Sequence, residues 1–243
     1  MADRILIVDD EPVIRDIVQR SLSRVGFEVI QAADGHEALE IVDRQEPSLV
    51  VLDILMRDMD GMAVLQQLRR THLVPVIMLT ARSDLNDRIA AIQAGADDYI
   101  TKPFSPRELE DRIRSVLHVD RGAPETTPAG LPGLVLESAN HVARVGSGAV
   151  QLTEMEFQLL ALLARNPGRL FTRSEILHRV WGYRVRYQTD GRVVDAHVAR
   201  LREKIEANPG RPELILDVRG SGFMCAAPVA GSSADGSRDR ALP

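Results

Sequence analysis

The sequence predicts a doubly wound α/β domain built on a five-stranded parallel sheet, followed by a smaller α+β domain. Short apolar runs alternate with helical patterns in the first half, and the run Leu49–Leu52 ends in Asp53. Continuous apolar runs of this kind indicate strands that are buried on both faces, as in parallel sheets. The charge also divides the chain, because residues 1–120 carry 14 Lys+Arg against 22 Asp+Glu, whereas residues 121–243 carry 16 against 13. An acidic half joined to a basic half suggests a cation site in the first and a polyanion site in the second.

Length and composition exclude several classes of protein. The chain has 243 residues, 44% hydrophobic and 27% charged, which is typical of a globular protein of two ordinary domains. Its single cysteine, Cys225, excludes an internal disulfide and favours a reducing compartment. No signal peptide is apparent and no apolar run approaches the ~20 residues of a membrane span. We therefore expect a cytoplasmic protein without a membrane partner.

The elements of the first half alternate regularly between strand and helix. Strands are expected at 4–8, 27–32, 49–53, 75–80 and 99–101. Helices are expected at 12–25, 35–44, 61–68, 84–95 and 106–117. Pro12 and Pro106 suit the first turn of a helix, and Ser105 with Glu108 forms a capping box. This alternation predicts a doubly wound parallel sheet.

Polar residues stand where the predicted strands end. Since parallel strands share one C-terminal edge, Asp9, Asp10, Asp53, Thr80 and Lys102 should converge there. Three adjacent carboxylates repel one another unless a cation lies between them, and Mg²⁺ suits oxygen ligands while keeping several waters. Aspartate is a nucleophile toward phosphoryl donors, and Thr80 and Lys102 offer a hydroxyl and an ammonium to the transferred group.

Each of these residues alone has an ordinary structural explanation as a cap, a turn residue or a solvated charge. Their conjunction at successive strand ends favours a function. The choice of lysine at position 102 supports it, because the chain has 28 arginines and only two lysines. A compact ammonium indicates that a point charge is needed there. The Lys102–Pro103 bond is also a candidate for a cis peptide.

The second half predicts a winged helix-turn-helix. Residues 120–132 are rich in proline, glycine and threonine and are expected to form a flexible linker after a first domain at 1–119. The second domain, 133–227, should contain short strands, two helices opened by capping boxes at Thr153 and Thr172, a third helix at about 191–207 and a closing hairpin at 214–225. The tail, 228–243, is expected to be disordered.

The third helix carries basic side chains away from its apolar stripe, namely Arg192, His197, Arg200, Arg202 and Lys204. A helix with a basic face fits the major groove of DNA. A solvated charged face is the alternative, and Glu203 and Glu206 on the same helix favour it. Arg219 in the hairpin could enter a minor groove or only solubilise a strand end. Trp181 is expected in the core, and His197 is expected to be a structural contact or phosphate donor.

The first half resembles the receiver domain of bacterial two-component response regulators over residues 3–118. The matching motifs are Ile7-Val8-Asp9-Asp10-Glu11, Leu52-Asp53, Leu79-Thr80-Ala81 and Gly95-Ala96-Asp97-Asp98-Tyr99-Ile100-Thr101-Lys102-Pro103-Phe104. The resemblance implies a flavodoxin-like fold in which Asp53 accepts phosphate from a sensor histidine kinase and Thr80 and Tyr99 form a switch pair. It implies Mg²⁺ bound by Asp10, Asp53 and the Leu55 carbonyl, and by Asp9 through water. No enzymatic action on separate substrates is implied.

The second half, about 134–226, resembles the effector domain of the OmpR/PhoB family. The motifs include Val180-Trp181-Gly182, Val194-Asp195-Ala196-His197-Val198, Leu201-Arg202-Glu203-Lys204 and Val218-Arg219-Gly220-Ser221-Gly222-Phe223. The resemblance implies binding to direct repeats in double-stranded DNA, with Arg200 reading bases, Arg219 in the wing and Arg173 and Arg202 on phosphates. RNA polymerase is a candidate partner.

The family resemblance also implies a phosphorylation-dependent homodimer through the receiver. The positions carried over are the pairs Arg88–Glu108 and Asp97–Arg112 around an apolar patch of Ile89 and Ile92. Several residues depart from the family pattern: Arg57 stands where a proline is usual, Asp111 where an alanine is frequent and Asp217 where a wing threonine is seen, and Ala199 and Met224 stand where basic residues occur. Two alternatives remain at this point. A Mg²⁺-dependent phosphatase or phosphotransferase would leave the basic half unexplained, and an orphan regulator would bind DNA without phosphorylation.

Overall fold

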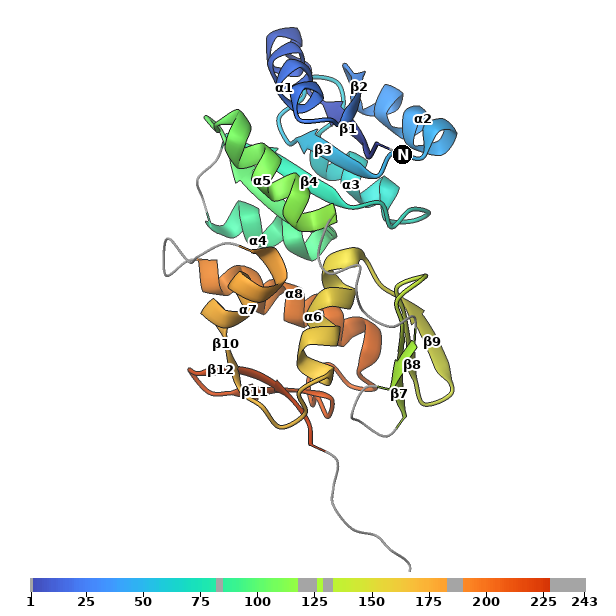
Figure 1. Ribbon diagram of the computed structural model, residues 1–243, viewed down its shortest axis with the longest axis vertical. Coiled ribbons are helices and arrows are strands. Elements are labelled where there is room, and N and C mark those ends of the chain that lie inside the picture. The colour runs from blue at the N-terminus through green and yellow to red at the C-terminus, as the bar shows by residue number, and fades with distance from the viewer. Residues whose placement is uncertain (1, 82–84, 118–125, 129–132, 183–189, 228–243) are drawn as a thin grey trace, which may run out of the picture.

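The computed structural model describes residues 2–81, 85–117, 126–128, 133–182 and 190–227. It shows two domains in contact (Figure 1). Helices α4 (Leu85–Ala94) and α5 (Pro106–Leu117) of the first face α6 (Glu154–Ala164), α7 (Arg173–Trp181) and α8 (Asp190–Ile205) of the second. None of the helices described is long and apolar enough to cross a bilayer. The predicted tail, 228–243, lies outside the described residues.

The first domain is a doubly wound sheet of five parallel strands in the order β2-β1-β3-β4-β5, as predicted. The strands are β1 (Arg4–Val8), β2 (Glu28–Ala32), β3 (Leu49–Asp53), β4 (Val76–Thr80) and β5 (Asp98–Thr101). The helices are α1 (Pro12–Arg24), α2 (Gly35–Gln45), α3 (Gly61–Leu68), α4 (Leu85–Ala94) and α5 (Pro106–Leu117). The Lys102–Pro103 bond is cis, as the sequence suggested.

Both faces of this sheet are buried, and the period-2 alternation of side chains explains how. Ile5 and Ile7 of β1 belong to one apolar cluster, together with residues of α1 and α5. Leu6 and Val8 belong to a second cluster, together with residues of α2, α3 and α4. Successive side chains of a strand point to opposite faces, so a continuous apolar run supplies both cores.

The second domain places three helices between two small antiparallel sheets. Its elements are β6 (Thr126–Pro128), β7 (Leu134–Glu137), β8 (Val142–Val145), β9 (Gly148–Gln151), α6 (Glu154–Ala164), β10 (Phe171–Thr172), α7 (Arg173–Trp181), α8 (Asp190–Ile205), β11 (Ile215–Val218) and β12 (Gly222–Cys225). One sheet has the order β6-β7-β8-β9 and the other, which includes the wing hairpin, the order β10-β12-β11. Both predicted capping boxes, at Thr153 and Thr172, are present.

Two strands were not predicted. The segment expected to be only a linker contributes β6, whose Thr126 pairs antiparallel with Glu137 of β7. β-branched Thr126 and Thr127 suit a strand, and Pro128 is tolerated because β6 lies at the sheet edge. The strand β10 pairs with β12. It was not predicted because two residues are too few to show an alternating pattern in the sequence.

Candidate functional site

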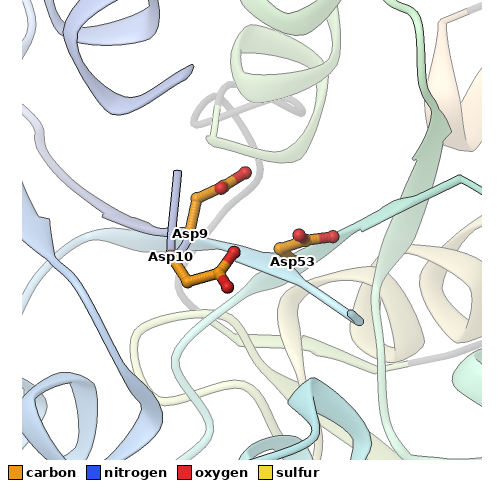
Figure 2. A group of neighbouring side chains, drawn as sticks. All are labelled: Asp9, Asp10 and Asp53. Carbon is orange, nitrogen blue, oxygen red and sulfur yellow. The ribbon is translucent and has the colours of Figure 1, made fainter. Parts of the chain in front are cut away.

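Three carboxylates gather at the C-terminal edge of the parallel sheet. Asp9 and Asp10 follow β1, and Asp53 is the last residue of β3. One oxygen from each lies within 4.8 Å of the others, and Figure 2 shows the three side chains on neighbouring strand ends. Asp9 is fully buried, Asp53 is 3% exposed and the side chain of Asp10 is 20% exposed. The three carboxylates therefore lie together at the sheet edge, as the sequence predicted, and Asp10 is the most exposed of them.

Lys102 neutralises part of this charge. Its Nζ donates hydrogen bonds to Oδ2 of Asp9 at 2.8 Å and to Oδ2 of Asp53 at 2.9 Å. Burial raises the pKa of Asp53, and the hydrogen bond from Lys102 opposes that shift. Burial acts to lower the pKa of Lys102, but its bonds to the two carboxylates prevail and raise it. The ammonium stays charged where the site needs a cation.

The second oxygen of Asp53, Oδ1, is buried and has no hydrogen-bond partner among the described residues. An unsatisfied buried carboxylate oxygen is costly and calls for a ligand. With Asp10 beside it, the donor set is made of hard oxygens, which fits Mg²⁺. Leu55, whose carbonyl was predicted as a further ligand, lies two residues beyond Asp53 in the same loop.

In the loop after Asp53, the backbone at Gly61 lies close to the backbone of Asp53 and Ile54. Gly61 donates its N–H to the Ile54 carbonyl at 3.0 Å. A Cβ added to Gly61 would lie 2.0 Å from the Asp53 carbonyl oxygen, so only glycine fits there. In the same loop Arg57, the departure from the usual proline, places its Nε 3.2 Å from Oδ2 of Asp10. A side-chain cation thus reaches one of the candidate metal ligands.

The predicted switch pair lies on adjacent strands. Thr80 ends β4 and is 2% exposed, while Tyr99 in β5 is 9% exposed and pairs in register with Met78. Nη1 of Arg88 donates to the Tyr99 hydroxyl at 3.4 Å, and its guanidinium carbon lies 5.1 Å from the ring centroid. Helix α4 is therefore tied directly to the ring of Tyr99.

The residues predicted for a dimer interface make contacts within the chain. Asp97 is fully buried and accepts a 2.9 Å hydrogen bond from Nη2 of Arg69. Nη1 of Arg112 donates to Asp98 at 3.2 Å. Burial raises the pKa of Asp98, and the charge of Arg112 opposes that shift. Ile92 is fully buried. Ile89 and Glu108 are partly buried.

Four of the arginines predicted to contact DNA lie around α8 and the wing. Arg192 and Arg219 are exposed. Nε of Arg173 donates to Asp195 at 2.7 Å. Nε and Nη2 of Arg202 donate to the Ile215 carbonyl at 3.0 and 2.6 Å, which ties α8 to the wing.

The other two predicted DNA contacts, Arg200 and His197, are buried in this structure. Arg200 is 7% exposed and His197 is 1% exposed. The ring of His197 packs 4.6 Å from that of Trp181, and neither ring nitrogen has a hydrogen-bond partner among the described residues. Burial, helped by the charge of Arg200, lowers the pKa of His197 well below its usual value. His197 is a structural contact here, one of the two roles that the sequence allowed.

Sequence reasoning missed Glu156 as a charge partner. Its Oε1 accepts from Nε of Arg200 at 2.5 Å and its Oε2 from Nζ of Lys204 at 2.6 Å. The sequence identified Glu156 only as the acidic member of a capping box. Its buried pairing joins residues 44 and 48 positions apart, which leaves no local signal.

Comparisons with known proteins match each half of the chain to a known domain family. The response regulator receiver domain family matches residues 5–114, and the family described as transcriptional regulatory protein, C terminal, matches residues 147–225. A probable transcriptional regulator ycf27 of Porphyridium aerugineum is 49% identical over 228 residues, covering 91% of this chain and 95% of the relative. That of Porphyra purpurea is 46% identical over 230 residues, covering 91% and 94%.

Two solved structures extend the likeness over both domains. The response regulator DrrB, described as a Thermotoga maritima OmpR/PhoB homolog, is 31% identical with a TM-score of 0.50 and covers 93% of this chain and 100% of its own. A point mutant of RitR is 25% identical with a TM-score of 0.73 and the same coverage. An acidic strand edge joined to a winged helix defines a response regulator with a DNA-binding domain, a regulator of transcription and not an enzyme acting on separate substrates. The chain belongs to the OmpR/PhoB-type family of these regulators.

Proposed function

We propose that this chain is the phosphorylation-activated regulator of a bacterial two-component system. A sensor histidine kinase transfers a phosphoryl group to Asp53, which promotes receiver dimerisation and binding to tandem half-sites in DNA. One observation carries the first step: Oδ1 of Asp53 is buried and has no partner among the described residues, in a carboxylate that accepts from Lys102 through Oδ2 and has an oxygen within 4.8 Å of one of Asp10. A nucleophile needs a free lone pair in a site that excludes water, and Asp53 offers one.

The chemistry assigned to the edge is an in-line displacement. A carboxylate oxygen of Asp53 attacks the phosphorus of a phosphohistidine, the P–N bond breaks, and the imidazole of the kinase leaves with that bond's electron pair. Mg²⁺, held by Asp10, Asp53, the Leu55 carbonyl and, through water, Asp9, would supply the positive charge that the phosphoryl oxygens require. Lys102 moves its ammonium from the Asp53 carboxylate onto a phosphoryl oxygen, and the Thr80 hydroxyl donates to another.

Transmission of the signal is assigned to the face formed by α4, β5 and α5. Thr80 turns toward the phosphoryl group and Tyr99 follows, which changes the position of Arg88 on α4. Residues on this face then pair with a second receiver, in the set Arg88, Ile89, Ile92, Asp97, Glu108 and Arg112. Two linked effector domains bind tandem repeats more tightly than one because the second contact is intramolecular.

The DNA contacts are assigned to α8 and the wing, with RNA polymerase as a candidate partner of the bound dimer. Arg200 reads a base edge, Arg219 lies in the wing, and Arg173, Arg192 and Arg202 contact the backbone, whereas the buried His197 remains a structural contact. Arg192 and Arg219 are already exposed, which supports their part in the assignment.

The phosphoacceptor is tested by intact mass after incubation with a small phosphodonor, with and without Mg²⁺. Wild type should gain one Mg²⁺-dependent phosphoryl group, and Asp53→Asn should gain none. Asp58→Asn, an exposed aspartate in the same loop, is the matched control and should behave as wild type. An adduct that persists on Asp53→Asn contradicts the site, and the absence of any adduct on wild type favours the orphan regulator.

The DNA contact is tested by the salt dependence of binding to a mixed-sequence duplex. Arg219→Ala should weaken binding and reduce the slope of log K against log salt by about one unit, because one phosphate contact is lost. Arg24→Ala, an exposed arginine at the end of α1, is the control. An unchanged slope in Arg219→Ala would remove the wing from the interface.

A further inference from the structure

Two phenylalanines lie side by side in the sheet that contains the wing hairpin. Phe171 of β10 pairs in register with Phe223 of β12, and both residues are buried. Directly paired residues of neighbouring strands have their side chains on the same face of a sheet. Helix α7 follows β10 directly in the chain and contacts it (Figure 1). The two rings therefore form one buried aromatic pair at the start of α7.

Four guanidinium groups lie over these two rings. Those of Arg169 and Arg179 lie 4.5 and 5.8 Å from the centroid of the β10 ring. Those of Arg173 and Arg202 lie 4.8 and 5.6 Å from the centroid of the β12 ring. A guanidinium within about 6 Å of an aromatic centroid is attracted electrostatically by the ring. The buried pair thus gathers four cations that are far apart in the sequence.

Two of the four cations keep donors for another ligand. The arginines over the β12 ring donate to groups of their own domain, whereas the two over the β10 ring are exposed. Among the described residues, the Arg179 guanidinium contacts the ring and donates no hydrogen bond. The Arg169 guanidinium has a long ion pair, with its Nη2 3.7 Å from Oε1 of Glu175. Such an exposed pair contributes at most about 1 kcal/mol, so it does not compete strongly with a ligand.

Glu175 shows that this surface suits an anion. Its Oε2 accepts from the N–H and the hydroxyl of Thr172 at 2.9 and 3.0 Å. These bonds, followed by the charges of Arg169 and Arg179, lower the pKa of Glu175. The ionised carboxylate offsets one of the two cations over the β10 ring. A net positive charge remains there and attracts a further anion.

We propose that Arg169 and Arg179 form a clamp for the phosphate backbone of DNA, in addition to the contacts assigned to α8 and the wing. A guanidinium presents a fork of N–H donors that matches phosphate oxygens. The ring already orders both side chains, so they lose less conformational entropy on binding. Because both adjoin one ring, the two guanidiniums lie within about 10 Å of each other and can contact phosphates of one strand. The inference rests on the proposed function, which assigns this domain to DNA.

Continuity with the assigned interface favours DNA as the ligand. β10 pairs with the wing strand β12, and Arg173, which is assigned to a phosphate, is the first residue of α7. In a helix-turn-helix the first helix crosses the DNA backbone, while the second enters the major groove. Because α7 precedes α8, its exposed arginine is expected at the backbone. The clamp contacts phosphates alone and therefore adds affinity without sequence preference.

The test compares the salt dependence of DNA binding in the full-length protein. Fluorescence anisotropy of two labelled duplexes of unrelated sequence gives the slope of log K against log salt for each. The variants are Arg169→Ala, Arg179→Ala, their combination and Arg179→Lys, which keeps the charge. Arg211→Ala, an exposed arginine ahead of β11 in the same domain, is the matched control. Equal midpoints of thermal unfolding establish that the variants remain folded.

Each single alanine variant should reduce the slope by about one unit and the double variant by about two, equally for both duplexes. Arg179→Lys should keep the wild-type slope because its charge remains, and Arg211→Ala should match wild type. A double variant with the wild-type slope overturns the clamp, even where Arg219→Ala shows that the wing contacts DNA. It would instead indicate that the pair faces a different partner.

Two other outcomes also overturn the clamp. A loss confined to one duplex would show sequence readout in place of phosphate contact, and an equal loss in Arg211→Ala would show a general effect of net charge. If wild type binds neither duplex, the assignment of this domain to DNA fails, and the clamp fails with it. Binding by wild type with no effect of the double variant refutes the clamp alone.

Discussion

Nε of Arg57 lies 3.2 Å from Oδ2 of Asp10, so that an arginine occupies one flank of the acidic edge. The family pattern has proline at this position, which carries no charge. The guanidinium is largely exposed, at 87%, and Asp10 is the most open of the three carboxylates. A metal ion bound by Asp10 would therefore compete with the Arg57 guanidinium for the Asp10 carboxylate.

Removing that competitor should tighten metal binding. An exposed ion pair contributes at most about 1 kcal/mol, so Arg57→Ala should raise Mg²⁺ affinity by up to about fivefold. The measurement is the midpoint of thermal unfolding as a function of Mg²⁺ concentration, since a ligand of the folded state stabilises it. Arg44→Ala, which breaks the exposed pair with Glu40 on α2, should leave the Mg²⁺ dependence unchanged. Equal or weaker affinity in Arg57→Ala would contradict competition.

Gly61 should not tolerate a side chain. A methyl group there would lie 2.0 Å from the Asp53 carbonyl oxygen, which is backbone and cannot move aside cheaply. Gly61→Ala should lower the free energy of unfolding by about 3 kcal/mol and reduce phosphorylation of Asp53. Chemical denaturation checks the first effect. Gly148→Ala, where a Cβ would make only an ordinary 3.5 Å contact, should change stability little, and a similar loss in both variants would exclude the steric explanation.

Glu156 should be a strong determinant of stability. It is fully buried and holds Arg200 and Lys204. Burial acts to raise its pKa, but the two cations prevail and lower it. Glu156→Gln keeps a side chain able to close the capping box but removes the charge, and should cost about 3 kcal/mol in urea denaturation. Exposed Glu203→Gln is the control. A loss no larger than that of the control would show that the buried charge contributes nothing.

His197 should make stability depend on pH. Its pKa is lowered well below 6.5 in the folded state, so below that value the unfolded chain binds more protons and folding weakens. Between about pH 7.5 and pH 5.5 this contribution should fall by as much as about 1.3 kcal/mol.

Denaturation followed by Trp181 emission checks this pH dependence. His197→Phe loses no hydrogen bond known from the described residues and should remove this component. His36→Phe, at an exposed position of α2, should retain it. The same pH slope in His197→Phe as in wild type would assign the effect to other groups.

The parallel sheet and the acidic edge could be predicted because the information is local. Each strand carries its own apolar run, and Asp9, Asp53 and Thr80 each stand directly at or after a strand end. Parallel topology then brings them together without further information. The capping boxes at Thr153 and Thr172 are equally local, since donor and acceptor are three residues apart. The strand β6 was missed because three residues show no periodicity.

Interactions between distant segments could not be predicted in this way. The sequence placed Arg200 on the basic face of a predicted recognition helix, and the structure adds that its guanidinium donates to carbonyls 104 and 108 residues earlier. The sequence does not show that Val193 and Ala196 contact the other domain. Two apolar residues beside the apolar stripe of a helix are indistinguishable from a wider face packed on the helix's own domain. The sequence by itself determined which residues form the acidic strand edge and helix α8. Only the tertiary structure decided that α8 lies against the receiver, because that contact depends on how the surfaces of two domains fit.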